Sequence, residues 1–314
     1  MNTSVRLATS SDFPAIAALL NAQADDDHQV DADAFERSEE SWVRHDPAFR
    51  RVVAVAEGMV VATGLVCANW GGSIEPGRSW LSITVHPDHV GHGIDVQVFD
   101  ALAGLVGAGA RELLVCVRED QARQLTYLVR CGFAERFRSW GAHLKLGAFD
   151  PSRWQDLAER LAADGVRLVL YHDLHADPER DAKLMALQDA LEADVVHFEP
   201  IIPKRSSNIV GPETNLDALV VAVTSDGSYV GLACLLGSPS DDSIGCGLTG
   251  VLPAYRGRGI ATALKARTAE IAKGWGAEEL NTGGGGGTDS AIARASRAIG
   301  FDVEPPWITY SKAL

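Results

Sequence analysis

A glycine-rich turn in the C-terminal half of the chain has the residue types that bind a phosphate group. The stretch VLPAYRGRGIATAL runs from Val251 to Leu264, with a strand-like segment before Pro253 and a helical pattern after Gly259. The first N–H groups of a helix have no partner within the helix, and the helix dipole adds positive potential there. Two glycines remove the Cβ atoms that would keep an anion away from the backbone. The turn is therefore predicted to bind a diphosphate.

The side chains around the two glycines agree with this prediction. Arg256 and Arg258 add positive charge, and Ala261 keeps the first helical turn small. A dinucleotide fingerprint would need Gly or Ala at Thr262, and a Walker loop would need G-K-[ST], so neither motif is present. A plain strand-to-helix turn is the structural alternative. We predict that the cofactor contacts Val251, Arg256, Gly257, Arg258, Gly259, Ile260, Ala261 and Thr262.

The N-terminal half contains a related turn with different side chains. In VHPDHVGHGID, Gly91 and Gly93 keep the glycine spacing, but Val90 replaces the arginine and Asp95 replaces the alanine. Two like charges about 6 Å apart, at an effective dielectric constant near 20, repel by roughly 1–3 kcal/mol. Asp95 would also stabilise the positive helix end itself. We therefore expect a weakened or lost cofactor site at Gly91 and Gly93, unless Asp95 points to solvent.

These two turns belong to a longer internal repeat. Pro87 and Pro253, Gly64 and Gly231, the C-G-F and I-G-F segments at 131–133 and 299–301, and Trp140 and Trp307 are each 166 to 168 residues apart. The apolar patterns predict strands at 5–9, 52–56, 60–68 and 112–117, and again at 166–171, 218–224, 229–236 and 278–282. Helices are predicted at 13–22 and 178–193, and Ile260, Leu264, Arg267 and Ile271 share one stripe of the helix after the second turn.

The repeat predicts an N-terminal domain over residues 1–150, a helical connector over 151–165, and a C-terminal domain over 166–314. The connector PSRWQDLAERLAADG begins with a capping serine, Ser152, and ends at Gly165. The intact turn lies in the second domain, so the activity is expected there.

The C-terminal turn resembles motif A of the GNAT acyltransferase superfamily, R/Q-x-x-G-x-G/A, through Arg256, Gly259 and Ala261. The I-G-F segment resembles the closing G-F of the same family. Taken as two copies, the resemblance covers nearly the whole chain, as in tandem GNAT proteins such as mycothiol synthase. It implies an α/β (α+β) fold with two domains, each a mixed, bent, mostly antiparallel sheet flanked by helices. It also implies that coenzyme A lies where the sheet splays, and that an amine attacks acetyl-CoA directly.

The residues that would carry proton transfer are less clear from the resemblance. Many GNAT enzymes have a tyrosine four residues before the glycine of the closing G-F, but Leu128 and Ser296 stand there in this chain. Ser296 could donate a hydrogen bond to the leaving thiolate. Glu199, beside His197 in the segment after a predicted helix, and Tyr310, on the closing strand, are further candidates. Each of these could instead be a structural residue.

The glycine run Gly283–Gly287 falls between a predicted strand and the next helix. Ordering five glycines costs much conformational entropy. We therefore interpret the run as a mobile loop over the active site, rather than as an anion-binding nest.

Composition limits the class of protein further. The 314 residues suit two domains, and the formal net charge of −14 argues against binding to nucleic acid or an anionic membrane. The sequence contains no run of about eighteen apolar residues, so we predict no membrane span. The first residues lack the pattern of a secretion signal. Five cysteines without C-x-x-C spacing indicate reduced thiols in the cytoplasm.

The sequence thus predicts an acetyl-CoA-dependent N-acetyltransferase that acts on the amine of an unidentified small molecule. A non-catalytic protein that binds or senses acyl-CoA is the alternative. We assign no metal site, and expect a monomer or a homodimer.

Overall fold

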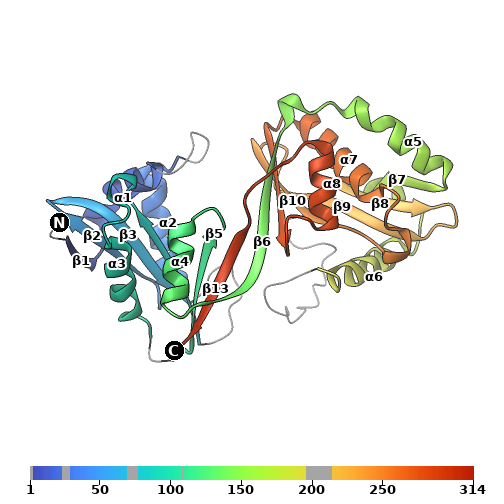
Figure 1. Ribbon diagram of the computed structural model, residues 1–314. Coiled ribbons are helices and arrows are strands. Elements are labelled where there is room, and N and C mark those ends of the chain that lie inside the picture. The colour runs from blue at the N-terminus through green and yellow to red at the C-terminus, as the bar shows by residue number, and fades with distance from the viewer. Residues whose placement is uncertain (1–2, 23–28, 69–76, 108, 196–213) are drawn as a thin grey trace. The chain divides into compact units, whose positions relative to one another are not determined.

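The computed structural model describes residues 3–22, 29–68, 77–107, 109–195 and 214–314. The chain forms two compact units, drawn in Figure 1. Unit 1 comprises residues up to Val117, Gln121–Arg136 and Ile308–Leu314, and unit 2 comprises Arg118–Asp120 and Phe137–Trp307.

Unit 1 is built on the strand order β1-β2-β3-β4-β5-β13. The first four strands are antiparallel neighbours, and β4 pairs with β5 in parallel. Its elements are β1 (Thr3–Leu7), α1 (Phe13–Asn21), α2 (Ala32–His45), β2 (Arg50–Ala56), β3 (Met59–Cys67), β4 (Arg78–Val85), α3 (Ile94–Ala103), β5 (Glu112–Arg118), α4 (Ala122–Arg130) and β13 (Trp307–Ala313).

Unit 2 has the strand order β6-β11-β10-β9-β8-β7, and β12 pairs with β6. The pairs are antiparallel except β10 with β11. Its elements are β6 (Ala134–Lys145), α5 (Gln155–Ala163), β7 (Val166–Leu170), α6 (Arg180–Glu192), β8 (Thr214–Thr224), β9 (Tyr229–Leu236), β10 (Ser243–Val251), α7 (Ile260–Trp275), β11 (Glu279–Gly285), α8 (Ala291–Ile299) and β12 (Asp302–Val303).

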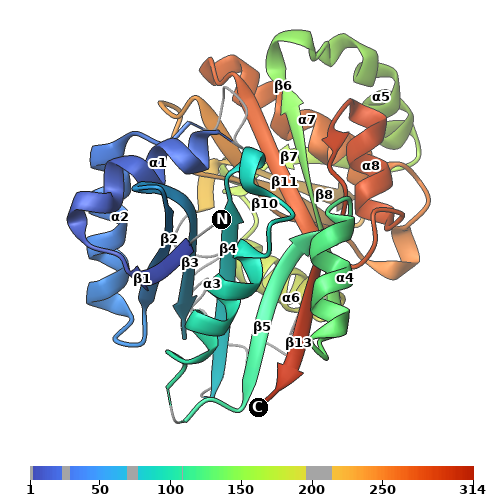
Figure 2. The ribbon, with the colours of Figure 1, turned by 60° about the vertical axis from the view of Figure 1, so that its left-hand side comes forward.

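Each sheet is covered on both faces because successive strand residues point to opposite sides. In unit 1, Val52 and Ala54 of β2 join the core beneath α3, whereas Val53 packs with α1 and α2, which Figure 2 shows on the other side of the strands. In unit 2, Val220 and Ala222 of β8 pack with α7 and α5. The alternate residues of the same strand, Leu219, Val221 and Val223, pack with α6. Each glycine-turn helix, α3 or α7, is therefore held by its apolar side chains against the sheet of its own unit.

The two units do not coincide with the two halves of the sequence. The last strand, β13, belongs to unit 1 from Ile308 onward, and most of β6 belongs to unit 2 from Phe137 onward. Each unit thus contains a strand from the other half of the sequence. The domain boundaries predicted at residues 150 and 166 follow the sequence repeat. They do not account for these two strands, each of which belongs to the unit of the other half.

The glycine run differs from its predicted structure. Gly283, Gly284 and Gly285 continue β11 and pair with Gly141, Trp140 and Ser139 of β6. A Cβ atom on Gly283 would lie 2.7 Å from the carbonyl oxygen of Trp140, so the close approach of the two strands requires glycine. The prediction of a mobile loop was wrong for these residues, because the neighbouring strand orders them.

The described part of the chain contains no helix that is long and apolar enough to cross a membrane.

Candidate cofactor and acyl-transfer site

The sheet of unit 2 opens between β10 and β11. The two strands pair at Ser243–Glu279, Ile244–Leu280 and Gly245–Asn281, and their pairing ends there. Beyond this point β10 stays paired with β9, with a register shift between Cys246 and Thr249, while β11 stays paired with β6. The strands therefore diverge, and Cys246 and Thr282 are the first residues of each strand past the last pair.

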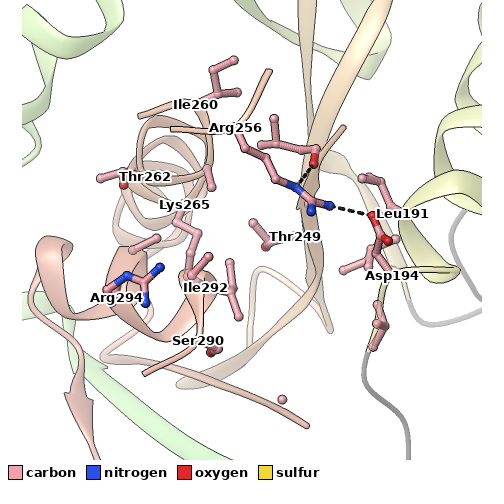
Figure 3. A pocket seen from close by; sticks show the side chains of 18 of the residues that line it. Leu191, Asp194, Thr249, Arg256, Ile260, Thr262, Lys265, Ser290, Ile292 and Arg294 are labelled. Carbon is pink, nitrogen blue, oxygen red and sulfur yellow. Dashed lines mark hydrogen bonds and ion pairs between the residues drawn. The ribbon is translucent and has the colours of Figure 1, made fainter. Parts of the chain in front are cut away.

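A pocket of about 800 Å³ lies in this opening, within the size range of sites for small molecules and cofactors. Its walls come from the diverging parts of β10 and β11, the turn between β10 and α7, the first turns of α7 and α8, and the end of α6. Figure 3 shows Ile260, Thr262 and Lys265 on the α7 side of this pocket.

The glycine turn has the geometry that the sequence predicts. Gly257 and Gly259 have φ angles of +77° and +84°, and Gly259 is the N-cap residue of α7. A Cβ atom on Gly257 would meet nothing within 4 Å, so this face of the turn is open. A Cβ atom on Gly259 would lie 3.0 Å from Leu157 of α5. The unpaired N–H groups of α7 are thus available to an anion at an uncovered surface.

The structure brings most of the predicted cofactor residues together. Val251, Arg256, Gly257, Gly259, Ile260, Ala261 and Thr262 all line the pocket. Arg258 is not among the described residues that line it, and its guanidinium lies 5.8 Å from the ring centre of Tyr255.

Arg256 is held by two groups that the sequence did not link to it. Its Nε donates to the carbonyl oxygen of Val251 over 2.9 Å, and its Nη2 lies 2.6 Å from Asp194 Oδ2. Figure 3 shows this pair on the other side of the pocket from Lys265 and Arg294. A phosphate at the turn would compete with Asp194 for Arg256, because both are anions.

Lys265 is a pocket residue that the sequence analysis missed. Its side chain is 2% exposed, its Nζ donates to Thr282 Oγ1 over 3.2 Å, and it lies 5.2 Å from the ring centre of Phe301. Burial lowers the pKa of Lys265 below its ordinary value, and burial raises the pKa of Cys246 beside it. A lysine on a helix face of small residues, Ala261, Thr262, Thr268 and Ala269, was the signal in the sequence.

The predicted catalytic side chains lie elsewhere or outside the described residues. Ser296 is fully buried, its Oγ donates to the carbonyl oxygen of Ile292 over 3.0 Å, and it is not among the described residues that line the pocket. Tyr310 lies in the apolar core of unit 1. Glu199 and His197 lie outside the described residues. The structure therefore does not bring Ser296 or Tyr310 to the pocket.

The related turn in unit 1 keeps the backbone, but its first glycine is covered, while a Cβ atom on Gly93 would meet nothing within 4 Å. Gly91 and Gly93 have φ angles of +90° and +75°, and Gly93 is the N-cap residue of α3. A Cβ atom on Gly91 would lie 2.7 Å from Arg123 Nη1, so a guanidinium from α4 already covers this glycine. Asp95 is half-buried in the first turn of α3.

Comparison with known proteins finds a family match in the C-terminal half of the chain. Residues 186–301 match the model of the acetyltransferase (GNAT) family. This match lies within unit 2 and agrees with the predicted resemblance, and members of the family transfer an acetyl group from acetyl-CoA. No curated protein matches the chain.

Solved structures show the same fold over nearly the whole chain. A GCN5-related N-acetyltransferase from Sphaerobacter thermophilus is 20% identical, with a TM-score of 0.61, and the match covers 99% of this chain and 95% of that one. A tandem GNAT protein from the clavulanic acid biosynthesis pathway is 14% identical, with a TM-score of 0.56 and coverage of 99% and 98%. A glucosamine N-acetyltransferase region of a fungal protein is 13% identical, with a TM-score of 0.60 and coverage of 99% and 38%. The predicted fold class, two tandem GNAT domains with mixed sheets flanked by helices, is confirmed.

Proposed function

We propose that the chain transfers the acetyl group of acetyl-CoA to the amine of a small molecule, and that this reaction takes place in unit 2. The observation that carries the proposal is the pocket between β10 and β11, which is continuous with the open glycine turn. One end of the pocket thus offers an anion site, and the other lies where the two strands part.

The residues of the turn fit the diphosphate of coenzyme A. Gly257 leaves space where a Cβ atom would stand, and Gly259 takes the left-handed conformation that begins α7. The backbone N–H groups of the first turn of α7 would hold the diphosphate, with Arg256 as its cationic partner. When bound, acetyl-CoA supplies a thioester whose carbonyl carbon an amine can attack.

The buried thiols favour direct attack by the amine over an acyl-enzyme. A thiolate, not a thiol, is the nucleophile in acyl transfer to cysteine. Burial raises the pKa of Cys234 to about 12 and raises that of Cys246, which lines the pocket. Both residues are therefore held as thiols at neutral pH, and neither is suited to carry the acetyl group.

Thiol release from acetyl-CoA in the presence of a panel of small amines tests the proposal, with binding of coenzyme A measured in parallel by calorimetry. We expect saturable binding, and thiol release that depends on the amine. Binding without release on any amine would favour the non-catalytic alternative. Absence of binding would contradict both.

A further inference from the structure

The pocket contains few groups that can exchange a proton. The described residues that line it include these titratable or charged side chains: Asp194, Cys246, Tyr255, Arg256, Lys265 and Arg294. Their only carboxylate, Asp194, is paired with Arg256, and Arg294 donates to the backbone carbonyl of Asp289. Arginine keeps its proton in proteins. Cys246 is held as a thiol by burial, and Tyr255 lies in the turn before α7. Among the described residues of the pocket, Lys265 is therefore the group best able both to accept and to release a proton.

Lys265 lies at the apex of the opening rather than at the phosphate end. Its Nζ donates to Thr282, the first residue of β11 past the last pair with β10, and Cys246 holds the same place on β10. Lys265 follows Gly259 by six residues along α7, a rise of about 9 Å. The glycine turn and the Lys265 amine thus mark two separated points of one elongated pocket.

Unit 1 shows what the fold alone requires at this position. Phe99 follows Gly93 by six residues, as Lys265 follows Gly259, and its ring lies 5.8 Å from that of Phe133. Phe133 and Phe301 are the phenylalanines of the two G-F segments. An apolar side chain against this ring satisfies the packing in unit 1. A lysine in the same place, without a paired carboxylate among the described residues, costs stability and so calls for a chemical reason.

We propose that Lys265 carries the proton of the acetyl transfer, taking it from the attacking amine and delivering it to the sulfur of the departing coenzyme A. The inference rests on the proposed function. The carbon–nitrogen bond forms as the carbon–sulfur bond breaks, the nitrogen loses one proton to Nζ, and the sulfur gains one proton from Nζ. Lys265 ends each cycle as it began, so no further reactant is needed.

The surroundings of Lys265 suit both halves of this transfer. Burial favours the neutral amine, which can accept a proton, and Thr282 Oγ1 accepts a hydrogen bond from Nζ and holds it in place. Once protonated, the ammonium stands in a site of low polarity, where it stabilises a nearby thiolate more strongly than it would in water. The same residue can thus replace the tyrosine whose position Ser296 occupies in this half of the chain.

The ionisation of bound coenzyme A tests the proposal without any acceptor amine. The thiolate absorbs in the far ultraviolet, so its fraction can be titrated against pH in complexes saturated with coenzyme A. Lys265→Met places an apolar side chain at the position in unit 2 that corresponds to Phe99 in unit 1. Lys273→Met, on the same helix, is the matched control, because Lys273 reaches the carbonyl oxygen of Phe149 and not the pocket.

We expect the thiol of coenzyme A to ionise at lower pH when bound to the unaltered protein than when bound to Lys265→Met, with on the order of tenfold more thiolate at a given pH, because burial acts on the thiol in both complexes and the amine in only one. Lys265→Met should still bind coenzyme A, while Lys273→Met should bind it and keep the larger thiolate fraction. Equal thiolate fractions in the unaltered and Lys265→Met complexes would overturn the proton-carrier role and leave the proposed function standing. If the unaltered protein does not bind coenzyme A at all, the proposed function itself is contradicted.

A second readout separates proton transfer from acetyl transfer onto Lys265 itself. We expect intact-mass and peptide analysis after incubation with acetyl-CoA to show no acetyl group on Lys265. Stoichiometric acetylation of Lys265 would overturn the proposal, because an amide nitrogen can no longer accept a proton.

Discussion

The two glycine turns have nearly the same backbone and different surfaces. In each, a strand ends, a short 3-10 turn begins at a proline, and a glycine with positive φ starts a helix. Gly257 faces open space, whereas Gly91 faces the guanidinium of Arg123. The second glycines show the reverse order, since Gly259 lies against Leu157 and Gly93 faces open space. The first helical turn carries Ala261 in unit 2 and Asp95 in unit 1.

This difference separates what the fold needs from what a ligand needs. Both units require glycine because both turns use left-handed φ angles, which cost other residues energy. An anion is also repelled by a carboxylate beside the turn, and of these two turns the one in unit 1 has such a residue, Asp95, whereas the first turn of α7 has no acidic residue. The same contrast recurs six residues on, where Phe99 completes a core and Lys265 places an amine in a pocket.

The largest expected effect comes from placing the same charge in both turns. Gly259→Asp should weaken coenzyme A binding by about 100-fold or more, because the carboxylate repels the diphosphate and its Cβ crowds Leu157. Gly93→Asp makes the matched change in unit 1 and should alter affinity less than about twofold. Calorimetry on both variants, with circular dichroism to verify folding, makes the comparison. Equal losses would mean that the two turns do not differ in function.

The next effect concerns stability. Lys265→Met should raise the free energy of unfolding at pH 7 by about 1–3 kcal/mol, because a buried polar group with one hydrogen bond is replaced by an apolar one. The folded-state pKa of Lys265 is lowered, so the unfolded chain binds more protons between that pKa and the ordinary lysine value. Stability of the unaltered protein should therefore rise with pH through this window.

Urea unfolding at several pH values measures this effect, with Lys273→Met as the control. The rise in the free energy of unfolding with pH should be missing from Lys265→Met and present in the control. A Lys265→Met protein that is less stable than the unaltered one at pH 7 would show that the lysine is there for packing.

The smallest effect is expected at the edge of the site. Asp194→Asn should strengthen coenzyme A binding by about three- to tenfold, because it frees Arg256 and removes a negative charge near the diphosphate. The Arg256–Asp194 pair is about half exposed, so the gain should shrink in high salt. Calorimetry at two salt concentrations provides the measurement, and weaker binding of Asp194→Asn would argue that Asp194 orients Arg256 for the ligand.

The sequence predicted the parts of the fold that depend on local pattern. The hairpin strands, the connector helix over Gln155–Ala163 and both glycine turns follow from periodicity and from glycine and proline positions. The stripe of α7 was predicted less well, since Arg267 is only partly buried and pairs with Glu270, while Lys265 is buried. Charge is a poor guide to burial where a pocket lies within the core.

The remaining differences arise from contacts between distant parts of the chain. The glycine run is ordered by β6, which lies more than a hundred residues earlier, and Tyr310 enters unit 1 because the last strand is exchanged. Ser296 turns its hydroxyl to the carbonyl of its own helix, a choice that residue spacing does not determine. The sequence could therefore locate the cofactor turn but not the group that handles the proton.

The central claim is that one of the two turns binds coenzyme A, and the stoichiometry of binding tests it most directly. Isothermal titration of the full-length protein with coenzyme A should give one site per chain, which Gly259→Asp abolishes and Gly93→Asp leaves in place. Two sites of similar affinity per chain, or one site that survives Gly259→Asp and is lost in Gly93→Asp, would contradict the account.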